Sequence, residues 1–135
     1  MLLQQQTEVK FWGWATPRSN VRIVTGWSND TIVVKANEKA KWEANLKTPE
    51  SGGSYLIKIW VKGKSITIKD VMIGELWLCS GQSNMEWNVE KGILDAKDAL
   101  PECYNNQIRF FFVDKATANY PQEDCKGYWK VCDAE

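Results

Sequence analysis

Histidine is absent from the 135-residue sequence. The imidazole group supplies the general base in Ser-His-Asp and Cys-His hydrolase sites, so these residues cannot assemble such a site by themselves. Zinc sites that use histidine are excluded for the same reason, and the four cysteines form no CxxC pair. We therefore expect neither a bound metal nor another cofactor.

An excess of one charge is also absent, since 17 basic residues are interleaved with 17 acidic ones. A protein that binds the phosphate backbone of nucleic acid needs a basic surplus, so we expect no nucleic-acid partner. No apolar run is long enough to span a bilayer. The N-terminus has neither the basic start nor the apolar stretch of a signal peptide, so we expect that the chain starts here or that a leader was removed.

Tryptophan is abundant: the chain has eight tryptophans, as many as its tyrosines and phenylalanines together. Large aromatic side chains fill the core of a β-sandwich more often than they form platforms for sugars, so we expect most of them in the core. The alternative is a non-catalytic carbohydrate-binding module with aromatic residues exposed on one face of the sandwich. The candidates for that face are Trp12, Trp14, Trp27 and Trp42.

Short strands with alternating apolar residues occupy residues 1–70. The alternation is clearest at Trp42, Ala44 and Leu46, and it recurs over residues 57–61. The expected strands are Glu8–Trp14, Val21–Thr25, Thr31–Ala36, Lys41–Leu46, Ser54–Lys62 and Ser65–Lys69. Strands at this spacing, separated by turn sequences and without a helical period, predict an all-β sandwich domain of the jelly-roll or immunoglobulin-like kind over residues 1–70.

The pattern changes after Asp70. Val71–Ser80 is a nearly continuous apolar run, typical of a strand covered on both faces of a parallel sheet. A helix that ends at about Pro101 and a second buried strand, Ile108–Val113, are expected to follow. This order predicts the first βαβ unit of a truncated α/β domain over residues 71–135, because too little chain remains to cover it.

The segment Gly81–Glu86, with the sequence GQSNME, follows the apolar run. Ser83 and Glu86 match a capping box, which predicts that the Ser83 hydroxyl lies at a helix N-terminus beside free backbone N–H groups. An acyl-transfer nucleophile needs that setting, and Gly81 allows a sharp turn before it. The alternative is that Ser83 only caps a helix, and Met85 replaces the second glycine of the G-x-S-x-G pattern.

The stretch Gly74–Trp87, GELWLCSGQSNMEW, closely resembles the nucleophile segment of sialate O-acetylesterases, which belong to the SGNH hydrolase superfamily. Shorter similarities extend over essentially the whole chain, at Leu2–Gln4, Trp12–Ala15, Gly52–Tyr55, Ile108–Phe111, Pro121–Cys125 and Trp129. The resemblance implies a β-domain joined to a flavodoxin-like α/β/α domain that removes O-acetyl groups from sialic acids.

In this family Ser83 corresponds to the nucleophile, its backbone N–H contributes to the oxyanion hole, and Gly81, Gln82 and Asn84 complete the motif. The family's further glycine and asparagine of that hole and its His-Asp base match no position in this sequence. The resemblance implies the N-terminal fragment of an esterase acting on O-acetylated sialic acid or a related acetylated glycan. Because histidine is absent, we expect the fragment itself to be inactive. The sequence indicates no oligomeric state.

Two cysteines bear on the location of the protein. Cys125 and Cys132 bracket a short segment containing Gly127, so they are candidates for a local disulfide in an oxidising compartment. Together with a glycan substrate, this predicts a secreted or periplasmic parent protein. Cys79 lies within the apolar run, and we expect it to be a buried, inert thiol.

Two other enzymatic interpretations stay open from the sequence. Glu75, Glu86 and Glu90 cluster near the motif and could supply the carboxylate pair of a retaining or inverting glycosidase. The GQSN segment is shared among carbohydrate esterases, so an esterase that acts on acetylated xylan or another plant polysaccharide is the alternative within the same chemistry.

Overall fold

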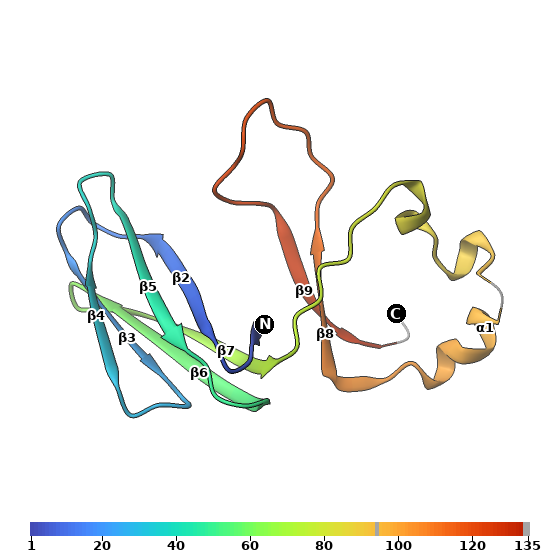
Figure 1. Cartoon of the computed structure of the whole chain (residues 1–135), viewed down its shortest axis with the longest axis horizontal. Helices are drawn as coiled ribbons and strands as arrows, with labels where there is room; N and C mark the ends of the chain where they lie inside the picture. The colour runs from blue at the N-terminus through green and yellow to red at the C-terminus, as the bar shows by residue number, and fades with distance from the viewer. Residues whose placement is uncertain (94, 134–135) are drawn as a thin grey trace. The chain divides into compact units, whose positions relative to one another are not determined.

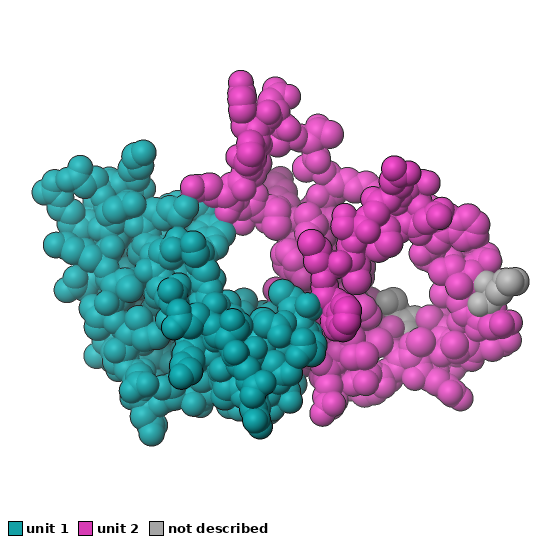
Figure 2. Space-filling view, in the orientation of Figure 1, with its two compact units in different colours: residues 1–76 teal, residues 77–135 magenta. Residues whose placement is uncertain are grey.

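The computed structural model describes residues 1–93 and 95–133, and its regular structure is mostly β-strand with little helix (Figure 1). The chain forms two compact units, Met1–Leu76 and Trp77–Glu135 (Figure 2). The boundary between them follows Leu76, whereas the sequence pattern placed it after Asp70. No helix within the described residues is long and apolar enough to cross a membrane.

The first unit consists of strands in two sheets. Their bounds are β1 Leu2–Gln4, β2 Glu8–Trp14, β3 Asn20–Thr25, β4 Thr31–Lys35, β5 Lys41–Lys47, β6 Gly52–Val61 and β7 Lys64–Gly74. Five of them form one sheet in the order β1-β7-β6-β3-β4, in which only the β1–β7 pair is parallel. Strands β2 and β5 pair with each other in a separate antiparallel ladder.

The two sheets of the first unit contribute to one hydrophobic core. The buried members from β5 are Trp42, Ala44 and Leu46, which are the alternate residues that the sequence pattern singled out. The five-stranded sheet supplies Ile23, Ile57, Val71 and other aliphatic residues to the same cluster. Because successive side chains of a strand point to opposite faces, this alternation buries one face of each sheet and leaves the other exposed.

The second unit contains one antiparallel pair, β8 Asn105–Val113 and β9 Gly127–Cys132. Among the described residues between β7 and β8 there are four short helices: η1 Ser83–Glu86, η2 Val89–Lys91, α1 Ala96–Ala99 and η3 Leu100–Glu102. The helix expected before Pro101 is therefore only four residues of α-helix followed by a 3₁₀ turn.

The expected βαβ unit is not formed by the described residues. The strand predicted over Val71–Ser80 ends at Gly74, and β7 pairs with β1 and β6 whereas β8 pairs with β9. Val71 and Ile73 are buried in the first unit, so they belong to an alternating strand. Beyond that strand Leu78 is 95% exposed, which shows that the apolar run does not mark a single buried strand. Strands β1 and β9 were not expected from the sequence.

Tryptophan does not mainly fill the core, contrary to the expectation from composition. Of the eight residues, all of which the structure describes, Trp42 alone is buried. The others are half-buried or exposed: Trp12, Trp14, Trp27, Trp60, Trp77, Trp87 and Trp129.

We expect two isoleucines in the five-stranded sheet to differ strongly in their contribution to stability. Ile57 is 0% exposed and Ile66 is 66% exposed. Replacing Ile57 by alanine leaves a cavity and lowers the free energy of unfolding by about 2–5 kcal/mol, whereas Ile66→Ala costs less than about 1 kcal/mol. Urea unfolding of both variants measures the difference, and equal losses would show that Ile57 is not part of the core.

Candidate active site around Ser83

Ser83 is the first residue of η1 and is exposed. Gln82 precedes it in an extended conformation as the N-cap, and its carbonyl oxygen accepts a hydrogen bond of 3.0 Å from the Met85 N–H. The N–H groups of the first residues of a helix have no acceptor within that helix. The N–H groups of Ser83 and Asn84 therefore lie at the start of η1, next to the hydroxyl that the sequence analysis singled out.

The capping box expected between Ser83 and Glu86 is not formed. Gln82 is the N-cap instead, and its side chain makes no capping hydrogen bond. Ser83 is thus the first residue of the helix and not its N-cap. Glu86 does not reach back to the start of the helix, because its carboxylate faces two lysines.

Gly81 and Met85 approach each other closely within the motif. A Cβ atom at this position would lie 2.8 Å from Cγ of Met85, which is closer than real side chains approach. Gly81 and Met85 are therefore a matched pair, because the small residue leaves room for the methionine one turn later.

Glu86 links the motif to the segment that follows β8. The Lys115 ammonium group donates a hydrogen bond to Glu86 Oε1, and Lys91 Nζ lies 3.8 Å from Oε2. The hydrogen bond from Lys115 is the main cause that lowers the pKa of Glu86, and the charges of Lys115 and Lys91 add to it. Lys115 could not be predicted as a partner from the sequence, because it lies 29 residues from Glu86 and only the tertiary fold brings the two side chains together.

Glu75 is held by the N-terminal strand of the first unit. Gln5 Nε2 donates to it at 2.6 Å and Gln4 Nε2 at 3.1 Å, and these hydrogen bonds lower its pKa. The general acid of a glycosidase needs a raised pKa so that it carries a proton at neutral pH. The pKa values of Glu75 and Glu86 are both lowered instead. Glu90 is exposed in η2. The structure therefore lends no support to a two-carboxylate glycosidase.

The four cysteines are free thiols, and Cys79 is exposed rather than buried as expected. The predicted Cys125–Cys132 disulfide is not formed. Strand β9 carries the chain roughly 17 Å between Gly127 and Cys132, and the two residues before Gly127 cannot recover that distance. Cys132 Sγ instead donates to the carbonyl oxygen of Cys103 at 3.8 Å. A disulfide needs Cα atoms within about 7 Å of each other.

Comparisons with known proteins bear out the resemblance to sialate O-acetylesterases. No protein-family model matches the chain. The sialate O-acetylesterase of Mus musculus is 26% identical over 122 residues, which are 84% of this chain and 23% of that protein. The Homo sapiens protein of the same name is 27% identical over 134 residues, which are 92% of this chain and 25% of that protein. The chain thus spans about a quarter of the length of these curated relatives.

A solved structure is similar over nearly the whole chain. The crystal structure of a carbohydrate acetylesterase from Xanthomonas citri superposes with a TM-score of 0.90 and 28% sequence identity. The match covers 98% of this chain and 30% of that protein. Both comparisons therefore point to enzymes that hydrolyse esters.

We expect Lys115→Gln to raise the pKa of Glu86 toward its ordinary value, because the substitution removes both the hydrogen bond and the nearest positive charge. Lys91→Gln, which removes a more distant charge, should raise it less. A ¹³C NMR titration of the Glu86 carboxyl carbon measures both shifts. In the unchanged protein the pair stabilises the fold above the unfolded pKa of Glu86, and this stabilisation is lost as the pH falls through the lower folded pKa. An unchanged pKa in Lys115→Gln would contradict the contact.

Proposed function

We propose that this chain carries the nucleophile segment of a carbohydrate acetylesterase, with Ser83 as the nucleophile. The observation that carries the proposal is the exposed serine at the start of η1, within a sequence similar to sialate O-acetylesterases and in a chain that superposes on a carbohydrate acetylesterase. Gly81, Gln82 and Asn84 support the serine by shaping the turn and the first residues of the helix.

The chemistry is a two-step acyl transfer. The Ser83 oxygen attacks the acetyl carbonyl carbon while a general base takes the hydroxyl proton, and the sugar oxygen leaves with a proton. Backbone N–H groups at the start of η1, beginning with that of Ser83, stabilise the negative charge on the carbonyl oxygen. Water then attacks the acetyl-serine and releases acetate. Because the sequence contains no histidine, a histidine base must come from residues outside these 135.

We also propose that the first unit is a β-sandwich domain and that the second unit is part of a flavodoxin-like α/β/α esterase domain. Apolar exposure in the second unit supports this assignment. Phe110, Phe111 and Phe112 of β8 are each more than 40% exposed, and an isolated pair of strands buries little apolar surface. Further elements packed on β8 and β9 would remove these side chains from water.

The substrate class is an O-acetylated glycan. O-acetylated sialic acid is the first candidate, because the curated relatives are named sialate O-acetylesterases. Acetylated xylan or another polysaccharide is the second candidate, because the similar solved structure is described as a carbohydrate acetylesterase. A glycan substrate agrees with a secreted or periplasmic location for the parent protein.

We expect the 135-residue chain to hydrolyse p-nitrophenyl acetate no faster than buffer, because it has no histidine to accept the Ser83 proton. A longer form of the protein that supplies the histidine should hydrolyse this ester. In that form Ser83→Ala should lower kcat by at least about 10³-fold, since it removes the attacking atom. Release of p-nitrophenol measures the rate.

Ser80→Ala is the matched control, because Ser80 lies in the same exposed segment outside the helix and should be dispensable. Acetate release from O-acetylated sialic acid and from acetylated xylan then identifies the substrate. Activity of the longer form that survives Ser83→Ala would overturn the assignment of the nucleophile.

A further inference from the structure

The outer face of the β2–β5 ladder carries a pair of tryptophans, of which Trp14 is exposed and Trp12 is half-buried. Trp12 and Trp14 are two residues apart on β2 and therefore lie on the same face. Gly13 between them faces the core, where a Cβ atom would lie 3.0 Å from Cζ2 of the buried Trp42. Since Trp42 fills the space beneath Gly13, the two flanking indoles are held on the side away from the core.

The two indoles leave aromatic surface open to a ligand. Their rings are perpendicular, with centroids 5.2 Å apart and an interplanar angle of 89°. In this edge-to-face arrangement one ring covers a single face of the other, so the pair does not bury its aromatic faces as a stacked pair would. Trp14 is 55% exposed, and the Lys41 ammonium group lies 5.8 Å from the centre of the Trp12 ring.

Hydrogen-bonding and charged side chains lie directly beside the indoles. Across the ladder Trp12 pairs with Glu43, and Trp14 pairs with Lys41. Glu43 is bridged to Lys10 at 3.0 Å, and Asn45 is the cross-strand neighbour of Lys10. The face therefore offers carboxylate, amide and ammonium groups around an aromatic centre.

This mixture fits a sugar better than a protein partner. The central part of a protein interface is depleted of charged residues, whereas here charges adjoin the aromatic pair. A pyranose ring has an apolar C–H face that stacks on an indole and a rim of hydroxyl groups that hydrogen-bond to carboxylate, amide and ammonium groups. The chemistry of the face thus matches an oligosaccharide.

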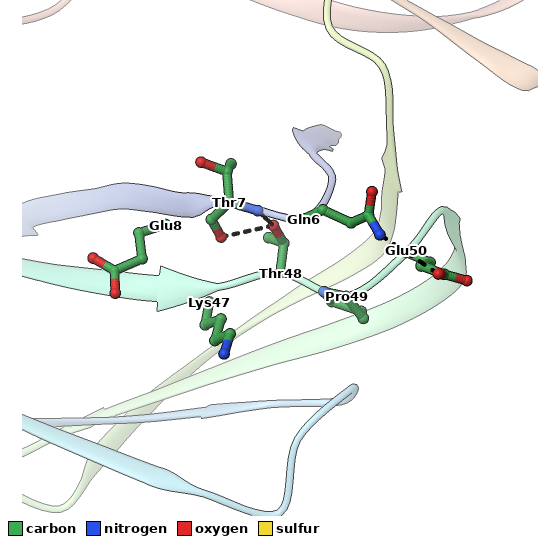
Figure 3. Close-up of a pocket in the computed structure, with 7 residues that line it drawn as sticks. All are labelled: Gln6, Thr7, Glu8, Lys47, Thr48, Pro49 and Glu50. Atoms are coloured by element: carbon green, nitrogen blue, oxygen red, sulfur yellow. Dashed lines mark hydrogen bonds between the residues drawn. The ribbon is translucent and has the colours of Figure 1, made fainter.

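A hollow lies at the other end of the ladder. Figure 3 shows this hollow, which has a volume of about 480 Å³ and is lined by Gln6, Thr7, Glu8, Lys47, Thr48, Pro49 and Glu50. Glu8 and Lys47 are cross-strand partners in the ladder. From Glu8 to Trp14 the strand extends roughly 20 Å, and Glu8 and Lys47, which line part of the hollow, lie on the same face of the ladder as the aromatic pair.

We propose that this face, the outer surface of β2 and β5 from the hollow to Trp14, binds the glycan chain of an oligosaccharide made of pyranose units. The site lies within the first unit and is distinct from Ser83 in the second. It holds the sugar by stacking on the Trp12–Trp14 pair and by hydrogen bonds to the flanking polar groups. The proposal concerns binding alone, so it holds or fails independently of Ser83 being a nucleophile.

The test is a titration of the 135-residue chain, followed by NMR through its indole N–H resonances. One titration uses xylohexaose and a second uses 3′-sialyllactose, which distinguish a neutral polysaccharide from a sialylated glycan as the source of the sugar. We expect saturable shifts of the Trp12 and Trp14 signals with at least one of them. The Trp60 signal should not move, because Trp60 lies on the other sheet beneath Arg22.

Substitutions then separate stacking from folding. Trp14→Ala should weaken binding roughly tenfold, and Trp14→Phe, which keeps an aromatic ring, should weaken it less. Trp60→Ala is the matched control, since it also removes a tryptophan that packs against a cation on an outer sheet face, and it should leave the affinity unchanged. Absence of saturable shifts with both oligosaccharides at millimolar concentration, or equal affinities for Trp14→Ala and Trp60→Ala, would overturn the proposal.

Discussion

The packing of the Trp42 indole beneath Gly13 is the contact on which the first unit depends. A protein interior is packed at close to crystal density, so the space taken by this ring cannot also hold a side chain at position 13. The contact sets which residues of β2 face the core and therefore which face water. Phe11 packs against the core beside Trp42, with ring centroids 6.0 Å apart, whereas the two tryptophans next to Gly13 lie outside. One inward tryptophan thus determines the outward position of two others.

The segment around Ser83 is shaped by weaker and more local forces. The approach of Met85 to Gly81 shapes the start of η1, and ion pairs of Glu86 with Lys91 and Lys115 tie it to its surroundings. Such exposed pairs contribute little to stability, because solvent screens them. An exposed serine in a segment of this kind suits a nucleophile, since catalytic groups are often carried on surface loops held by a more rigid scaffold.

The two proposals assign different tasks to the two units. Acyl transfer needs the Ser83 hydroxyl, N–H groups at the start of a short helix and a base that this sequence lacks. Glycan binding needs only a rigid aromatic face, which the core of the first unit holds in place through Trp42. The similarity to carbohydrate acetylesterases agrees with both tasks, because such an enzyme must recognise a sugar as well as cleave an ester.

The sequence by itself determined most strands of the first unit, the candidate nucleophile and the absence of a histidine base. Strand alternation and a specific motif are local signals, which is why β2 was placed at Glu8–Trp14 as the structure has it. Only the tertiary structure decided that Val71 and Ile73 complete the first unit, that Glu86 pairs with Lys115, and that most tryptophans are not buried. These features depend on which segments, distant in the sequence, pack against each face of a strand. A two-residue period in the sequence predicts that side chains alternate between the two faces, but it does not say which segment covers either face.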